Sequence, residues 1–364
     1  MSYSFNAAKA AFADDQIREL SEDPSGYRFL LLRSLSRAEA MRTLARNCNC
    51  NVSGIPAREL LQHLYENESI SPEQIKSTIE DIYTVERSDR KRNEANLISE
   101  LYRIQSFDWG GLHQNSLEKT IVNNYVKKIS SYDALCESID NRLYPSMRSY
   151  VLCSWYNHWT SIIIEDVFKD HPSVIPAVGL IKKIDFFLHG MPFDLKVTYL
   201  PEGFIKEKRK NNSLRPELTL LKRFARSQHI PFDAKMADAR LLEDLWEKVS
   251  DHPSDDATAL IFELKKFRDT LVDASVADSD ELIRWLYENQ GVRRFDASNR
   301  LFLILIKKGD YFNSWKLKRA RDLLISEIHS GLDAFDPELA QLIDFLWEGS
   351  TYQAMSSTIF VVQD

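Results

Sequence analysis

The residues whose types and spacing could do chemistry lie in the segment 184–200, which reads IDFFLHGMPFDLKVTYL. Eight residues separate Asp185 from Asp194, and Lys196 follows Asp194 by two positions. Carboxylate oxygens are the ligands that Mg²⁺ prefers, and a bound metal ion can activate water. A neighbouring ammonium can offset the charge that develops on a phosphate oxygen. The set therefore predicts metal-dependent hydrolysis of a phosphate ester.

A tight hairpin would bring these side chains together. His189-Gly190 is suited to a two-residue hairpin loop, because Gly190 accepts a positive φ angle. With that loop, Asp185 lies opposite Asp194 in a non-hydrogen-bonded pair, in which the two Cβ atoms are roughly 4.5–5.5 Å apart. Two carboxylates at this distance repel each other, so we expect a divalent cation between them.

Alternation of side chains gives the predicted hairpin two chemically different faces. One face receives only apolar residues, namely Ile184, Phe186, Leu188, Met191, Phe193, Leu195 and Val197. The other face receives the candidate site and its neighbours, namely Asp185, Phe187, Pro192, Asp194, Lys196 and Thr198. An ordinary surface hairpin with solvated charges is the alternative interpretation. The wholly apolar face favours a hairpin that is packed on a core.

A third carboxylate is expected from the helix that precedes the hairpin. Residues 147–169 carry an apolar stripe at helical spacing, made of Leu152, Trp155, Tyr156, Trp159 and Ile163. Glu165 lies near the end of this helix at the edge of the stripe, so it is predicted to join the two aspartates. The adjacent Asp166 is the alternative ligand, and a solvated surface acid is the alternative interpretation of Glu165.

The wider pattern predicts an α/β (α+β) fold, in which helices flank a small mixed sheet. Residues 1–110 read as a helical N-terminal domain, with Gly110-Gly111 as a helix-breaking boundary. The second domain, 111–364, would carry strand-like segments between residues 174 and 200. A helical insertion is expected at about 214–278.

The last third of the chain completes the expected sheet. The continuous apolar run 300–306 predicts a buried strand, because buried strands are apolar on both faces. An amphipathic helix is expected at 314–328, and a final strand at 357–363.

These residues resemble the PD-(D/E)XK nuclease superfamily, the fold of many type II restriction endonucleases. That family has a helix with a Glu and then three strands, of which the second carries an Asp and the third an acid-x-Lys triplet. Glu165 matches the helix position, and Asp185 matches the first acid. Asp194 and Lys196 match the triplet, which reads D-L-K here. Ile184 stands where the family often has proline.

The resemblance covers residues 147–200 and, more loosely, 279–330. It implies a restriction-endonuclease-like core in which Asp185, Asp194, Lys196 and Glu165 are catalytic and the three acids hold Mg²⁺, with Mn²⁺ able to substitute. It implies hydrolysis of double-stranded DNA at a short specific sequence. It also implies a homodimer, whose two-fold axis suits a palindromic site, and a cognate DNA methyltransferase as genetic partner.

Two basic clusters follow the predicted core strands and suggest contacts with DNA phosphates. The first contains Lys206, Lys208, Arg209, Lys210, Arg215, Lys222, Arg223 and Arg226, and the second contains Lys316, Lys318, Arg319 and Arg321. Of these, all but Arg321 are taken as candidate DNA-binding residues. The alternative is that they are solvated helix faces, since the formal net charge of the chain is −7.

Composition excludes several other classes. The four cysteines are too scattered for a disulfide scaffold, so a reducing cytoplasm is expected. The sequence contains no apolar run of about 18 residues that would span a membrane, and no glycine-rich phosphate loop or dinucleotide motif. A structure- or modification-dependent nuclease in DNA repair or defence, and a non-catalytic helical DNA-binding protein, are the alternative functions.

Overall fold

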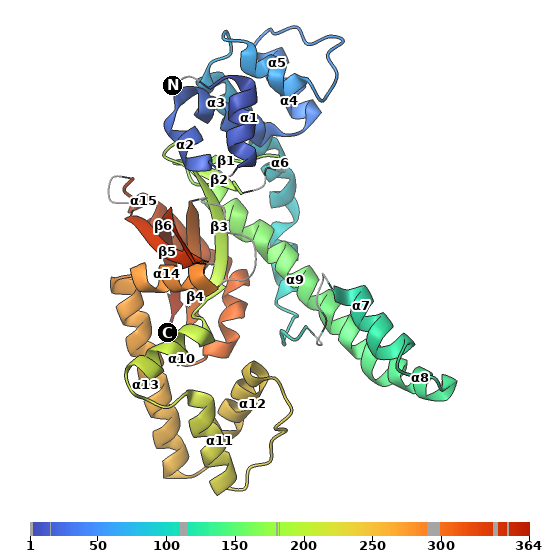
Figure 1. Ribbon diagram of the computed structural model, residues 1–364, viewed down its shortest axis with the longest axis vertical. Coiled ribbons are helices and arrows are strands. Elements are labelled where there is room, and N and C mark those ends of the chain that lie inside the picture. Colours follow the sequence, from blue (N-terminus) through green and yellow to red (C-terminus); the bar gives the residue numbers. More distant parts are fainter. Residues whose placement is uncertain are drawn as a thin grey trace.

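The structure is a computed structural model in which helices surround one sheet (Figure 1). It describes residues 3–14, 16–109, 112, 116–179, 181, 183–289, 299–337, 341–347 and 349–364. The sheet has six strands in the order β1-β2-β3-β4-β6-β5. The predicted mixed α/β class is therefore confirmed. Among the residues described, no helix is long and apolar enough to cross a membrane.

The N-terminal part is helical, as predicted. Its helices are α1 (Phe5–Ala13), α2 (Ile17–Glu22), α3 (Pro24–Leu35), α4 (Ala38–Asn47), α5 (Leu60–Glu66) and α6 (Pro72–Leu101). Helix α6 begins with a capping box, in which the side chains of Ser71 and Gln74 each accept a hydrogen bond from the other's backbone N–H. The buried side chains form one cluster, which also receives Ile184 and Phe187 from the hairpin. The N-terminal helices are therefore packed directly on the hairpin.

Helix α9 (Tyr144–Lys169) confirms the helix predicted over 147–169 and has two environments along its length. Its first half forms a projecting arm (Figure 1) with the α-helices α7 (Leu117–Ile121) and α8 (Tyr132–Ser138) and the short π-helices η2 (Val122–Val126) and η3 (Ile139–Leu143). Its second half packs on the sheet through Ile164, Val167 and Phe168. The boundary predicted at Gly110-Gly111 lies outside the described residues.

Strand β3 changes its hydrogen-bonding partner part-way along its length. The strands are β1 (Val174–Pro176), β2 (Phe186–Leu188), β3 (Met191–Tyr199), β4 (Arg300–Lys307), β5 (Gln341–Trp347) and β6 (Ser350–Gln363). β3 is antiparallel to β2 as far as Phe193, and from Asp194 onward it pairs in parallel with β4. The two parts of the sheet therefore meet between these two residues.

The helices after β3 include the predicted insertion. They are α10 (Glu202–Asn211), α11 (Glu217–Ser227), α12 (Asp238–Ser250), α13 (Asp255–Ala277) and α14 (Asp280–Asn289). Helices α11, α12 and α13 share a separate cluster, to which Leu221, Leu245 and Ile261 contribute. In Figure 1, α11 and α12 lie at the opposite end of the long axis from the N-terminal helices. The helical character predicted for 214–278 is confirmed.

The two faces of the sheet are covered by different helices. On one face, Leu301 and Leu303 of β4 pack with α9 and with α15 (Arg321–Asp333). On the other face, Phe302 and Ile304 pack with α10 and α14. Because side chains alternate along a strand and β3 is in register with β4, Asp194 and Lys196 lie on the face that α9 does not cover.

The single helix predicted over 314–328 is wrong in its first part. The chain forms a 3₁₀ helix, η4 (Tyr311–Arg319), and α15 begins only at Arg321. Ala320, with φ −80° and ψ 68°, separates the two. The buried side chains of Trp315, Leu317 and Arg319 hold η4 against the core, so packing overrides the amphipathic pattern. The final strand is confirmed as part of β6, which is paired with β5.

Candidate active site

The turn of the hairpin has the predicted geometry. His189 and Gly190 both have positive φ angles, 48° and 83°, which suits a two-residue loop. Leu188 pairs with Met191, and Phe187 pairs with Pro192. The predicted register is therefore confirmed next to the loop.

The register changes at Asp185, and here the prediction needs correction. The ladder between β2 and β3 ends at Phe186 and Phe193, and the backbone N–H of Asp185 donates to the Phe193 carbonyl at 2.8 Å. Ile184 consequently packs in the N-terminal cluster with Phe187, not on the face of Phe186. Asp185 and Asp194 are therefore not a ladder pair, and Asp194 pairs on the other side of β3 with Arg300 of β4.

The carboxylate of Asp185 nevertheless points to β3. Its Oδ2 accepts a hydrogen bond from the backbone N–H of Leu195 at 2.7 Å. Burial, together with the negative charges of Asp194 and Glu165, raises the pKa of Asp185 to about 6, although the Leu195 N–H and Lys169 act in the opposite direction. The charges of Asp194 and Glu165, two other predicted catalytic residues, therefore act on Asp185.

Asp194 is held between two cationic side chains. Lys196 Nζ lies 2.7 Å from Asp194 Oδ1, and Arg300 Nε lies 3.5 Å from Oδ2. Arg300 is buried, and its guanidinium lies over the ring of Tyr287. Lys196 therefore lies beside Asp194, as predicted. Arg300 was missed, although a charge at the start of the apolar run 300–306 was a visible signal.

Glu165 and Asp166 project to different neighbours, and the structure distinguishes the two alternatives. Asp166 is buried and binds Arg90 through both oxygens at 2.7 and 2.8 Å, so it ties α9 to α6. Glu165 is half-exposed and pairs with Lys169 at 2.9 Å. Of these two acids, Glu165 is the one whose charge helps to raise the pKa of Asp185. Asp166 is therefore a structural residue, and Glu165 is the better candidate ligand.

The donor chemistry fits a hard divalent cation, but the three acids do not form one ligand group. Asp185, Asp194 and Glu165 offer carboxylate oxygens, which suit Mg²⁺. Among the residues described, no three acidic, histidine or cysteine side chains are close enough to hold a metal ion together. Glu165 comes from the face that α9 covers, whereas Asp194 lies on the other face. Asp185 lies just before β2, and both Asp194 and Glu165 are close enough to raise its pKa.

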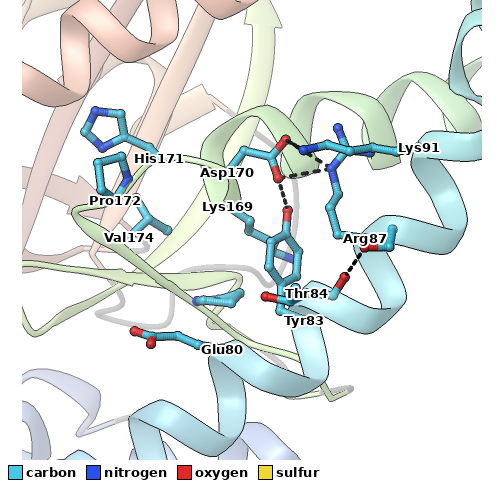
Figure 2. A pocket seen from close by; sticks show the side chains of 12 residues that line it. Glu80, Tyr83, Thr84, Arg87, Lys91, Lys169, Asp170, His171, Pro172 and Val174 are labelled. Carbon is cyan, nitrogen blue, oxygen red and sulfur yellow. Dashed lines mark hydrogen bonds and ion pairs between the residues drawn. The ribbon is translucent and has the colours of Figure 1, made fainter.

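A pocket of about 430 Å³ lies between α6, the end of α9 and β1 (Figure 2). Its wall includes Lys169, the last residue of α9, and Asp170, which follows it. Asp170 accepts hydrogen bonds from Tyr83 at 2.9 Å and Arg87 at 3.0 Å, and it lies 3.4 Å from Lys91 Nζ. The charges on this side of the pocket are therefore largely paired.

The predicted DNA-binding residues do not form one surface. Arg209 and Arg319 are buried: Arg209 donates to the carbonyl of Arg215, and Arg319 donates to the carbonyls of Leu101 and Ile104. Both therefore have structural roles, which corrects their assignment as phosphate contacts. The exposed members of the set are Lys206, Lys210, Arg215, Arg223 and Arg226.

The remaining four basic residues are partly covered. Lys208 forms an ion pair with Glu281, and Lys222 lies 3.6 Å from Asp238. Lys316 lies over the ring of Trp315. Lys318 donates to Asn157 at 3.0 Å, and burial lowers its pKa to about 8. In Figure 1, α11, which carries Lys222, Arg223 and Arg226, lies far from β2.

Comparisons with known proteins leave the function to be argued from this geometry. The chain matches no protein-family model, no curated protein and no solved structure.

Proposed function

We propose that this chain is a Mg²⁺-dependent endonuclease that hydrolyses phosphodiester bonds of double-stranded DNA. The observation that carries the proposal is the convergence of Asp185 on Asp194, next to Lys196. Asp185 Oδ2 accepts a hydrogen bond from the backbone N–H of Leu195 at 2.7 Å, and Lys196 Nζ donates one to Asp194 Oδ1 at 2.7 Å. Two acids and a lysine are the groups that metal-assisted phosphate hydrolysis needs; here Asp194 and Lys196 lie within β3, and Asp185 directly precedes β2.

The order of the elements supports a restriction-endonuclease-like core. Helix α9 carries Glu165, and β1, β2 and β3 follow it as antiparallel neighbours. After the inserted helices, β4 returns parallel to β3. The PD-(D/E)XK family has a Glu-bearing helix, three strands, a helix and a further strand, and this chain has the same order with α14 before β4.

Each residue has a role in the proposed reaction. Asp185 and Asp194 would hold the cation, with Glu165 as a third oxygen ligand. When bound, Mg²⁺ supplies Lewis acidity and draws charge from the phosphate. Lys196 is placed to donate hydrogen bonds to the attacking water and to a phosphoryl oxygen. Arg300 orients Asp194 from the other side, because its Nε lies 3.5 Å from Oδ2.

We further propose that the enzyme is a type II restriction endonuclease that acts as a homodimer, with a cognate DNA methyltransferase as genetic partner. The exposed residues Lys206, Lys210, Arg215, Arg223 and Arg226 would contact phosphates along the duplex. Two-fold symmetry would place one active site on each strand of a palindrome.

Plasmid cleavage tests the proposal. Purified chain with Mg²⁺ is expected to cut supercoiled plasmid into discrete bands, and Lys196→Ala is expected to abolish cutting without loss of DNA binding. Lys307→Ala is the matched control, because Lys307 is also a strand lysine paired with an aspartate, Asp310, at 2.6 Å. The control is expected to cut like the wild type.

The other outcomes distinguish the alternatives. A smear, or cutting restricted to modified or branched DNA, would favour the nuclease of repair or defence. No cutting by the wild-type chain, with DNA binding intact, would favour the non-catalytic DNA-binding protein and would overturn the enzymatic proposal.

A further inference from the structure

Lys169 holds the one candidate ligand that comes from a helix. It lies one turn after Glu165 on α9, and its Nζ is 2.9 Å from Glu165 Oε2. The Lys169 side chain is only 12% exposed, whereas that of Glu165 is 36% exposed. The ammonium is therefore shielded on the protein side of the pair, and the carboxylate can still be reached from solvent.

The neighbours of Lys169 leave Glu165 as its partner. Asp170 is adjacent in sequence, but Figure 2 shows its carboxylate turned to Arg87, Lys91 and Tyr83. The hydrogen bond of Lys169 to Glu165 is the contact that holds its ammonium. The pair therefore neutralises the acid that would otherwise be available to a cation.

Lys169 also has space to move into if this pair breaks. It lines the pocket of about 430 Å³, whose wall includes the acidic side chains of Glu80 and Asp170. An ammonium released from Glu165 would face this pocket and its Glu80 carboxylate, since the carboxylate of Asp170 is already paired with Arg87 and Lys91.

We propose that Lys169 competes with the divalent cation for Glu165, so that the third ligand joins the metal centre only when the Lys169–Glu165 pair opens. A carboxylate oxygen that accepts a hydrogen bond from a close ammonium binds a divalent cation less strongly. The inference rests on the proposed function, and it adds a positioning residue that the family pattern does not contain.

Mn²⁺ titration in the absence of DNA tests the inference. A calorimetric titration of the wild type measures affinity while Lys169 is present, and Lys169→Met removes the competitor with similar side-chain volume. We expect Lys169→Met to bind Mn²⁺ about fivefold more tightly, the effect of losing a partly exposed ion pair of about 1 kcal/mol. Lys169→Arg retains the pair and is expected to bind like the wild type.

A matched control separates competition from a general loss of positive charge. Lys91 lines the same pocket and pairs with Asp170, not with Glu165. Lys91→Met is therefore expected to leave Mn²⁺ affinity unchanged. In a Glu165→Gln background, Lys169→Met is expected to have a smaller effect, because the contested carboxylate is gone and only the electrostatic action of Lys169 on Asp185 remains.

The possible failures can be told apart. If Lys169→Met and a second variant, Lys169→Gln, leave Mn²⁺ affinity unchanged or weaken it while their thermal melts remain cooperative, Lys169 is not a competitor and the inference is overturned. If Asp185→Asn and Asp194→Asn bind Mn²⁺ as tightly as the wild type does, the metal is not at this centre and the proposed function itself fails.

Discussion

The backbone N–H of Leu195 donates a hydrogen bond to the carboxylate of Asp185 at 2.7 Å, at the point where β3 leaves β2 and joins β4. A side chain thus accepts the hydrogen bond that a regular antiparallel ladder would give to a backbone carbonyl. This contact aims Asp185 at β3 and keeps it near Asp194. The candidate centre is therefore built into a defect of the sheet.

The first prediction concerns the pH dependence of stability. Burial and Asp194 raise the pKa of Asp185 from its ordinary 3.8 to about 6, so the ionised carboxylate disfavours the folded state. The resulting loss of folding stability is absent below the ordinary pKa of 3.8, grows as the pH rises, and is complete above the raised pKa of about 6. Asp185→Asn lacks this penalty and can still accept from Leu195. We expect it to be more stable than the wild type by about 2–3 kcal/mol near neutral pH in EDTA.

Urea unfolding of both proteins in EDTA, from about pH 4 to about pH 8, measures this difference. The gap is expected to close at the acidic end. A constant gap across the range would show that Asp185 does not titrate as its surroundings require. Adding Mn²⁺ is expected to favour the wild type, since Asn is a weaker ligand.

The second prediction concerns the turn that sets the register. Gly190 has φ 83°, and a Cβ added there would meet only Tyr27 Oη, at 3.9 Å. The cost of Gly190→Ala is therefore backbone strain, about 1 kcal/mol of unfolding free energy. Gly190→Asn is the control, because Asn adopts positive φ more readily and is expected to cost less. Equal losses in urea unfolding would show that strain is not the cause.

The third prediction concerns the ion cluster that holds the inserted helices. Arg268 is fully buried under aromatic rings, and it binds Glu217 at 2.5 Å and Glu202 at 2.8 Å. Arg268→Met leaves the buried Glu217 without its cation. We expect a loss of about 3–5 kcal/mol of unfolding free energy.

An exposed ion pair provides the control for that variant. Arg240 lies 3.0 Å from Asp108, and both side chains are exposed. Arg240→Met is expected to change stability by about 0.5 kcal/mol or less in the same urea titration. A similar loss in the two variants would mean that burial does not determine the cost.

The fourth prediction separates exposed from buried basic residues. Arg223 and Arg226 are exposed on α11, whereas Arg319 is buried and bonded to backbone carbonyls. If α11 contacts phosphates, Arg223→Ala and Arg226→Ala each reduce the salt dependence of DNA binding by about one unit of log–log slope. Arg319→Ala is expected to lower the melting temperature instead. Filter binding between about 50 and 200 mM salt measures the slope. Unchanged slopes in both α11 variants would remove α11 from the DNA surface.

Local features were predictable because short segments contain their causes. His189-Gly190 closes a two-residue loop whatever surrounds it, so the register next to the loop could be read from the sequence. The long helix α9 follows from its apolar spacing in the same way. Glu165 was correctly placed near the end of this helix, but its neighbours depended on what packs beside it.

The failures occurred where distant segments meet. Arg300 reaches Asp194 only because β4 pairs with β3 after a long insertion, and no local pattern specifies that register. Charge runs cannot show which basic residues face inward, so Arg209 and Arg319 were expected on the surface and are buried.

The sequence by itself determined the turn, the long helix α9 and the presence of two acids and a lysine within one hairpin, because these depend on neighbours a few positions away. Only the tertiary structure decided that β3 exchanges β2 for β4 at Asp194, that Asp166 binds α6, and that Lys169 holds Glu165. The physical reason is that strand pairing and ion pairing depend on distances in space, and the packing of remote segments sets those distances.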